Sequence, residues 1–309
     1  MILDRFLLSM LRKAMGFRGD GNPFLKYFRE KEFGISSTPF SFYSGKNLLR
    51  GKRFYVEGDF PRAVVIFFHG LGAGYNAYMQ EIAAIAKRGY LVYAYDNTGC
   101  MTSEGQGIGC LAQSLLDQQA FFTFLDSEKQ AEGLPRYAVG HSWGGYTALG
   151  ALDPRYGVEK VVSISGFISL TRTLMSQEKA LAKMEHSLRK ALRLGYGEFG
   201  ALEMADLVFK TSARVLYIQG ENDPMVPKPG NYDVLESLCK GKPNVRLMLV
   251  KGAMHNPYWT LDAQKYLYEL GNKQHAFGLN FDNSLEIDYQ RLNQDDPKVM
   301  GEIFGFLAE

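Results

Sequence analysis

A serine between two glycines is the first feature of the sequence that suggests chemistry. Gly140, Ser142 and Gly144 form the pattern GxSxG within GHSWG. The apolar run RYAV precedes this pattern, and the helix-like run GGYTALGAL follows it. A nucleophilic serine needs this setting of strand, turn and helix because it must stand exposed on a sharp, strained turn. Side chains at the two glycine positions would collide with neighbouring backbone. Ser142 is therefore the candidate nucleophile.

This setting resembles the nucleophile elbow of the α/β-hydrolase superfamily. The resemblance implies an α/β-hydrolase fold, with a mostly parallel central sheet, helices on both faces and a small helical cap. A serine at its ordinary pKa is a poor nucleophile, so a base and an acid that orients the base must accompany it. In this superfamily the acid and then the histidine follow the serine along the chain.

Asp223 and His255 occupy the positions that the resemblance implies for the acid and the base. Asp223 lies in the turn GENDPMVP after a strand-like run, and Glu221 in the same turn is the nearest competing carboxylate. His255 follows the last strand-like run of the sequence. The other histidines lie in the predicted cap, in an irregular stretch or in other motifs. We therefore predict a catalytic triad of Ser142, Asp223 and His255.

The resemblance also implies a pair of backbone amides that bind an oxyanion. They belong to Leu71, in the turn FHGLG after an early strand, and to Trp143. His69 is expected to brace this turn through hydrogen bonds, and Gly70 to let the backbone approach the substrate. Many relatives carry an Arg-Gly-His-Gly turn after the next strand, where this chain has NTGC at 97–100. That departure weakens any narrow subfamily assignment but leaves the predicted triad intact.

Strand-like and helix-like runs alternate along most of the chain. Apolar runs predict strands at 63–70, 90–96, 136–142, 160–166, 213–220 and 245–252, and helical patterns occupy 75–87, 111–125 and 232–238. An antiparallel edge hairpin is expected near 40–58. This βαβ rhythm predicts a mainly parallel sheet with helices on both faces.

We expect residues 1–309 to form a single α/β-hydrolase domain, because no low-complexity linker or internal repeat divides the chain. Residues 1–39 form an N-terminal helical extension. The stretch 168–211 reads as helices without a strand, which predicts an inserted helical cap at the end of a strand. The irregular stretch 271–297 has no assigned function, and a short helix closes the chain at 298–308.

Composition narrows the class of protein. Hydrophobic residues make up 46% of the 309 residues and charged residues 22%, as in ordinary folded proteins. A net charge of +2 lacks the excess of basic residues that is typical of nucleic-acid-binding proteins, so no nucleic-acid partner is expected. The three cysteines are too few and too scattered for a disulfide framework, which indicates a reducing compartment, and we expect a cytoplasmic protein. Cys100 and Cys110 are expected to be two ordinary thiols rather than a redox pair. No HExxH, Walker A or CxxC motif occurs, so no metal or cofactor is implied.

The N-terminal stretch MILDRFLLSMLRKAMGF predicts an amphipathic helix. Its apolar residues fall at helical spacing, with Arg5 and Arg12 off that face. The apolar set is Ile2, Leu3, Phe6, Leu7, Met10, Leu11 and Ala14. We expect this helix to dock on the body of the protein, and contact with a lipid surface is the less favoured alternative.

The predicted activity is cleavage of carboxylic esters of small acyl compounds through an acyl-enzyme, similar to that of monoacylglycerol lipases. The apolar cap would suit a hydrocarbon acyl group. Its apolar residues are Leu170, Leu174, Met175, Leu181, Met184, Leu188, Leu192 and Leu194. An alternative is an aminopeptidase or amidase of the same superfamily, in which Glu178, Glu185, Glu198 or Glu203 would receive a free amine. A further alternative is a non-catalytic binding module of the same fold. Oligomeric state is left open.

Overall fold

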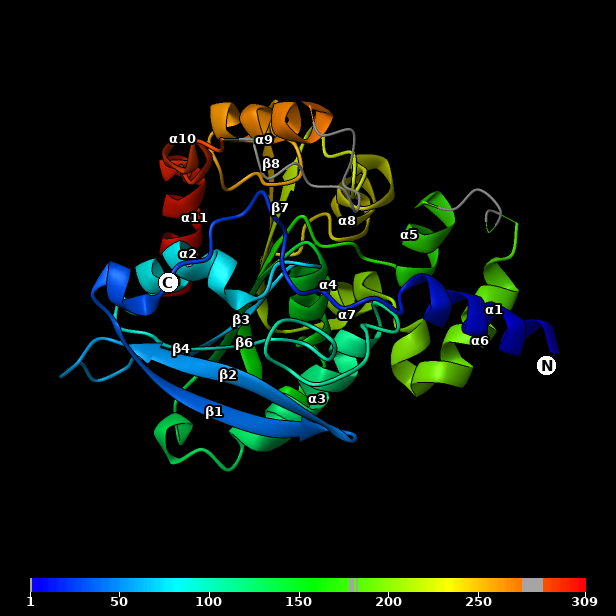
Figure 1. Cartoon of the computed structure of the whole chain (residues 1–309), viewed down its shortest axis with the longest axis horizontal. Coiled ribbons are helices and arrows are strands. Elements are labelled where there is room, and N and C mark those ends of the chain that lie inside the picture. Colours follow the sequence, from blue (N-terminus) through cyan, green and yellow to red (C-terminus); the bar gives the residue numbers. More distant parts are fainter. Residues whose placement is uncertain (1, 178–180, 182, 274–285) are drawn as a thin grey trace.

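The computed structural model describes residues 2–177, 181, 183–273 and 286–309 and is organised around one eight-stranded sheet (Figure 1). The strand order is β1-β2-β4-β3-β5-β6-β7-β8. The strands are β1 (Ser36–Ser44), β2 (Asn47–Tyr55), β3 (Val64–Phe68), β4 (Leu91–Tyr95), β5 (Arg136–His141), β6 (Val158–Ile164), β7 (Arg214–Gly220) and β8 (Val245–Val250). Strands β1 and β2 form an antiparallel edge hairpin, β2 pairs antiparallel with β4, and the other neighbours are parallel. The predicted mainly parallel sheet is confirmed, although the hairpin begins at Ser36 rather than near residue 40.

The central strands are buried because both faces of the sheet are covered. Strand β3 consists of β-branched and aromatic residues and is buried along its whole length. Val64, Ile66 and Phe68 contribute to one apolar core, whereas Val65 and Phe67 contribute to another on the opposite face. This alternation follows from the two-residue period of a strand. Continuous apolar runs in the sequence therefore mark strands that are covered on both sides.

Helices form the two outer layers. Helices α2 and α11 supply residues to one core, and α3 and α4 supply residues to the other. The helices are α1 (Ile2–Ala14), α2 (Met79–Ala86), α3 (Gln113–Leu125), α4 (Trp143–Gly150), α5 (Leu170–Gln177), α6 (Glu185–Tyr196), α7 (Met204–Lys210), α8 (Tyr232–Leu238), α9 (Leu261–Lys273), α10 (Tyr289–Leu292) and α11 (Pro297–Ala308). None of the helices in the described ranges is both long enough and apolar enough to cross a bilayer.

Helix α1 packs against α6, but the predicted buried face of α1 is partly wrong (Figure 1). Helix α1 buries Leu7, Leu8 and Leu11. Three residues of the predicted apolar face are instead exposed: Leu3, Phe6 and Met10. The physical reason is a glycine in α6. An added Cβ at Gly195 would lie only 2.5 Å from Leu8, so the missing side chain makes room for Leu8 and turns the contact face toward it.

The stretch predicted as a cap lies between β6 and β7 and holds α5, α6 and α7. Leu188 and Leu192 of α6 are fully buried and pack with Met204 and Val208 of α7 in the core that also receives α3 and α4. Much of the apolar character of this stretch is therefore used in packing. How the chain divides into domains stays a prediction.

Candidate active site

Ser142 sits on a strained turn between β5 and α4. Its backbone has φ 59° and ψ −119°, a conformation that costs a residue with a side chain about 1–3 kcal/mol and persists only where the surroundings impose it. An added Cβ at Gly140 would lie 2.1 Å from the carbonyl oxygen of Gly144. One at Gly144 would lie 2.0 Å from the carbonyl oxygen of Phe68. Both glycines are therefore required by the close approach of backbone around the serine.

The structure brings Ser142, His255 and Asp223 together from the ends of three parallel strands. Nε2 of His255 lies 2.8 Å from Oγ of Ser142, and Nδ1 lies 2.9 and 3.0 Å from the two carboxylate oxygens of Asp223. An ionised carboxylate can only accept hydrogen bonds, so the proton of a neutral His255 resides on Nδ1. Nε2 is then free to accept the proton of the Ser142 hydroxyl. This is the geometry of a serine activated by a base.

Asp223 is held as a carboxylate by the turn that follows it. Burial opposes its ionisation, but hydrogen bonds from His255 and from the amides of Val226 and Met225 outweigh burial and keep the pKa of Asp223 below its ordinary value. The buried side chain of Gln219 donates a further hydrogen bond at 3.0 Å. The competing Glu221 is exposed and accepts from the amide of Gly252 at 2.8 Å. Within the described part of the chain, the carboxylate that contacts His255 is that of Asp223.

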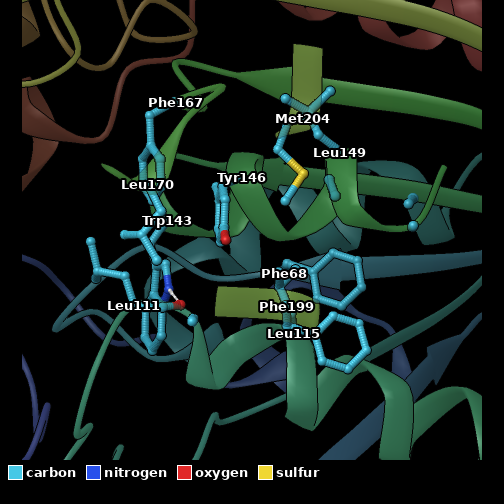
Figure 2. Packing of buried hydrophobic residues seen from close by; sticks show 14 of the residues in the cluster. Phe68, Leu111, Leu115, Trp143, Tyr146, Leu149, Phe167, Leu170, Phe199 and Met204 are labelled. Atoms are coloured by element: carbon cyan, nitrogen blue, oxygen red, sulfur yellow. Dashed lines mark hydrogen bonds between the residues drawn. The ribbon is translucent and has the colours of Figure 1, made fainter. Parts of the chain in front are cut away.

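The two amides predicted to bind an oxyanion lie after β3 and directly after the serine. Leu71 lies in the turn after β3, and the residue is 40% exposed. Trp143 begins α4, and its buried indole nitrogen donates to the carbonyl of Leu111 at 2.7 Å, as Figure 2 shows. That bond and the surrounding apolar side chains fix the first turn of the helix. Neither amide donates to a carbonyl among the residues that the structure describes.

His69 has the hydrogen bonds that its predicted bracing role requires. Nδ1 of His69 donates to the carbonyl of Gly70 at 2.8 Å, and the amide of Asn97 donates to Nε2 at 3.0 Å. Burial lowers the pKa of His69, so the ring is neutral and both nitrogens are satisfied. The turn after β3 is therefore fastened to the NTGC loop after β4.

Asp117 anchors the other side of the NTGC loop and was not singled out in the sequence. It is fully buried on α3 and accepts from the amide of Thr98 at 2.7 Å and from the hydroxyls of Thr98 and Ser44. Burial raises its pKa against the effect of these hydrogen bonds. The available signal was the single charged residue in the helical run 111–125.

Comparisons with known proteins agree on the fold. Residues 59–203, less than half of the chain, match the family model described as serine aminopeptidase, S33. A solved esterase from Pyrococcus furiosus superposes with a TM-score of 0.60 at 20% identity, covering 83% of this chain and 95% of the esterase. The acylaminoacyl peptidase of Pyrococcus horikoshii superposes with a TM-score of 0.55 at 18% identity, covering 81% of this chain and 43% of the peptidase. A search of curated proteins finds no significant match. The chain therefore has the α/β-hydrolase fold.

Three acidic residues of the stretch predicted as a cap are engaged in ion pairs. Glu185 and Glu203 both pair with Arg189, at 3.1 and 2.8 Å, and Glu198 pairs with Arg155 at 2.9 Å. Glu178, the fourth carboxylate considered for an amine site, lies outside the described residues. Three of the four candidates thus already have cationic partners.

The two cysteines around the NTGC loop are free thiols. Cys100 and Cys110 are both buried and unpaired with each other. Burial raises both pKa values, that of Cys110 to about 11, so both stay protonated near neutral pH. The structure thus favours the two ordinary thiols over a redox pair.

A buried pair of carboxyl groups lies behind the loop that carries His255. The backbone of Asp295 forms an isolated antiparallel β-bridge with that of Trp259, four residues after His255. The amide of Asp296 donates to the carbonyl of Tyr258 at 2.8 Å. Glu81 of α2 is buried beside Asp295, and burial is the main cause that raises the pKa of each, that of Asp295 to about 6. Part of the stretch that had no assigned function therefore packs against the base-bearing loop.

Replacing Asp295 with asparagine is expected to stabilise the protein above about pH 7. The folded wild type keeps this proton up to about pH 6, whereas the unfolded chain releases it near about pH 4. The contribution of Asp295 to the free energy of unfolding therefore falls as the pH rises between these values. Asp295→Asn should lack that fall, so its stability relative to the wild type should rise by up to about 3 kcal/mol between about pH 4 and pH 8. Urea unfolding across this range measures it.

The exposed Asp59 provides the matched control, since Asp59→Asn should leave the free energy of unfolding unchanged at each pH. A stability difference between Asp295→Asn and the wild type that stays constant between about pH 4 and pH 6 would contradict the raised pKa of Asp295.

Proposed function

We propose that this α/β-hydrolase is a serine hydrolase that cleaves carboxylic esters of small acyl compounds. One observation carries the proposal. A serine on a strained strand-to-helix turn lies 2.8 Å from Nε2 of His255, and a buried carboxylate holds the other nitrogen of the same ring. These are the requirements for an activated serine nucleophile.

The proposed reaction follows from the positions of the protons. Ser142 Oγ attacks the acyl carbonyl as Nε2 of His255 takes the hydroxyl proton, and Asp223 stabilises the resulting imidazolium. The amides of Leu71 and Trp143 donate to the oxyanion, and each such donor is worth about 3 kcal/mol in the transition state. His255 then gives its proton to the leaving alkoxide. Water then attacks the acyl carbon and loses a proton to His255. The bond between the acyl carbon and Ser142 Oγ breaks, His255 returns the proton to Oγ, and the carboxylic acid leaves.

Ester cleavage is supported over peptide cleavage by the charges of the cap. An aminopeptidase needs a carboxylate that is available to a free amine, and three candidates in the cap are occupied by arginines. The likeness to a solved esterase over most of both chains points the same way. The match of residues 59–203 to the serine aminopeptidase family favours the second candidate, an aminopeptidase or amidase that uses the same triad.

A substrate panel separates the candidates. We expect p-nitrophenyl esters of short and medium acyl chains to be hydrolysed with a larger kcat/KM than aminoacyl p-nitroanilides. Ser142→Ala serves as the blank for both. Faster release from an anilide would contradict the ester proposal and favour the aminopeptidase. Rates equal to the blank for every substrate would favour a non-catalytic binding module.

A further inference from the structure

Three loops of the proposed active site are joined by hydrogen bonds that pass through Tyr78 and His141. Tyr78 ends the short 3-10 turn η2 (Tyr75–Tyr78) before α2, and His141 is the last residue of β5, directly before Ser142. The amide of Gly70 lies 3.1 Å from Oη of Tyr78. Oη lies 2.9 Å from Nδ1 of His141, and Nε2 of His141 lies 2.9 Å from the carbonyl oxygen of His255. The turn after β3, the serine turn and the base-bearing loop are thus connected.

The donor and the acceptor of each hydrogen bond in this series follow from the two groups at its ends, the amide of Gly70 and the carbonyl of His255. The carbonyl of His255 can only accept, so Nε2 of His141 must carry a proton. In a neutral imidazole Nδ1 is then an acceptor, and the hydroxyl of Tyr78 must donate to it. The hydroxyl oxygen in turn accepts from the amide of Gly70. All four groups are satisfied by a single arrangement of protons.

The surroundings hold that arrangement. Tyr78 and His141 are both buried, and the ring of Tyr258 packs edge-on against His141 with centroids 5.1 Å apart. Burial, followed by the nearby charge of His255, lowers the pKa of His141 to about 3, which keeps its ring neutral. An added Cβ at Gly70 would lie 2.6 Å from Oη of Tyr78, so the glycine permits the hydroxyl to reach its amide.

We propose that Tyr78 and His141 are positioning residues that set the reacting atoms of the triad and of the oxyanion site relative to one another. The inference rests on the proposed function. The bond to the His255 carbonyl fixes the backbone that carries the base. The bond to the Gly70 amide fixes the peptide between His69 and Gly70, one residue before the amide of Leu71. His141 joins both to the residue before the nucleophile, and its ring also lies against the ring of His255, with centroids 5.0 Å apart.

Removing the hydroxyl of Tyr78 should therefore affect the chemical step more than substrate binding. Tyr78→Phe leaves the Gly70 amide and Nδ1 of His141 without their partner, and a displacement of reacting groups by about 1 Å costs about 10²-fold in rate. We expect kcat on an ester to fall about 10- to 100-fold with KM changed by less than about threefold. Tyr95→Phe is the matched control because Tyr95 is equally buried and its hydroxyl has no partner among the described residues.

Two substitutions of His141 test whether a side chain that can still donate a hydrogen bond preserves part of the activity. The amide of His141→Gln can still donate to the carbonyl of His255, whereas His141→Leu cannot. The glutamine variant should therefore retain more of kcat than the leucine variant at matched stability. A leucine variant with a kcat equal to that of the glutamine variant would overturn the positioning role of His141.

The closing experiment combines a labelling rate with a spectroscopic signature. In protein with ¹⁵N-labelled histidine, His141 should show a protonated Nε2 and an unprotonated Nδ1 that do not titrate between about pH 5 and pH 9. The Nδ1 resonance should move in Tyr78→Phe and stay in Tyr95→Phe. A fluorophosphonate should label Ser142 about 10-fold or more slowly in Tyr78→Phe than in Tyr95→Phe.

The outcomes distinguish the two claims. Labelling of the wild type and of both tyrosine variants at one rate would overturn the positioning role alone. An opposite tautomer at His141 would overturn it as well. A wild type that is not labelled would overturn the proposed function and the positioning role together.

Discussion

Replacing Ser142 with alanine is expected to lower kcat for ester hydrolysis by about 10⁶-fold. The substitution removes the oxygen that bonds to the acyl carbon, and the oxyanion amides alone sustain only the residual rate. The fold should persist, because alanine keeps a Cβ and fits the same backbone. Initial rates on a p-nitrophenyl ester and thermal unfolding of both proteins measure the two parts of this result.

Ser165 offers a matched control for that substitution. It is a second serine with positive φ, 48°, at the end of the neighbouring strand β6, and its buried hydroxyl has no partner in the described part of the chain. Ser165→Ala should keep kcat within about threefold of the wild type, as expected of a side chain outside the reaction. A larger loss in Ser165→Ala than in Ser142→Ala would show that the nucleophile is misassigned.

Replacing Asp223 with asparagine is expected to lower kcat by about 10⁴-fold. The carboxamide would turn its NH₂ group or its oxygen toward His255, and hydrogen bonds from the amides of Met225 and Val226 hold the oxygen on their side. The NH₂ group then faces Nδ1 and drives the ring proton to Nε2. A protonated Nε2 cannot accept the proton of Ser142, so the base is present in the wrong tautomer.

Glu221→Gln tests whether the identity of the acid is correct. Glu221 lies two positions from Asp223 on the same turn, but its side chain binds the amide of Gly252. We expect its kcat to match the wild type, while the loss in Asp223→Asn persists across the pH range of activity. If Glu221→Gln caused the larger loss, the acid of the triad would be Glu221.

The parallel core was predictable from the sequence because its strands are covered on both faces. Strands β3 and β4 consist of apolar residues and β5 to β7 each contain a short apolar run, and the observed bounds lie within about two residues of the predicted ones. Parallel strands end at one edge of the sheet, so the order of Ser142, Asp223 and His255 along the chain sufficed to bring them to one place. A resemblance to a known fold then supplied the roles.

The rest depends on contacts that no spacing encodes. The face of α1 that is buried follows from the absence of a side chain at Gly195, far along the chain. Tyr78 escaped notice because a tyrosine in a turn is indistinguishable from a packing residue until His141 is seen beside it. The choice between Glu221 and Asp223 is made by the amides of the turn that captures Asp223.

Mass measurement of the intact protein after treatment with a fluorophosphonate probe tests the central claim most directly. An activated Ser142 predicts one covalent adduct on the wild type and none on Ser142→Ala, with labelling of Ser165→Ala equal to that of the wild type. An adduct that persists on Ser142→Ala, or no adduct on any of the three proteins, would contradict the assignment of Ser142, His255 and Asp223 as a working triad.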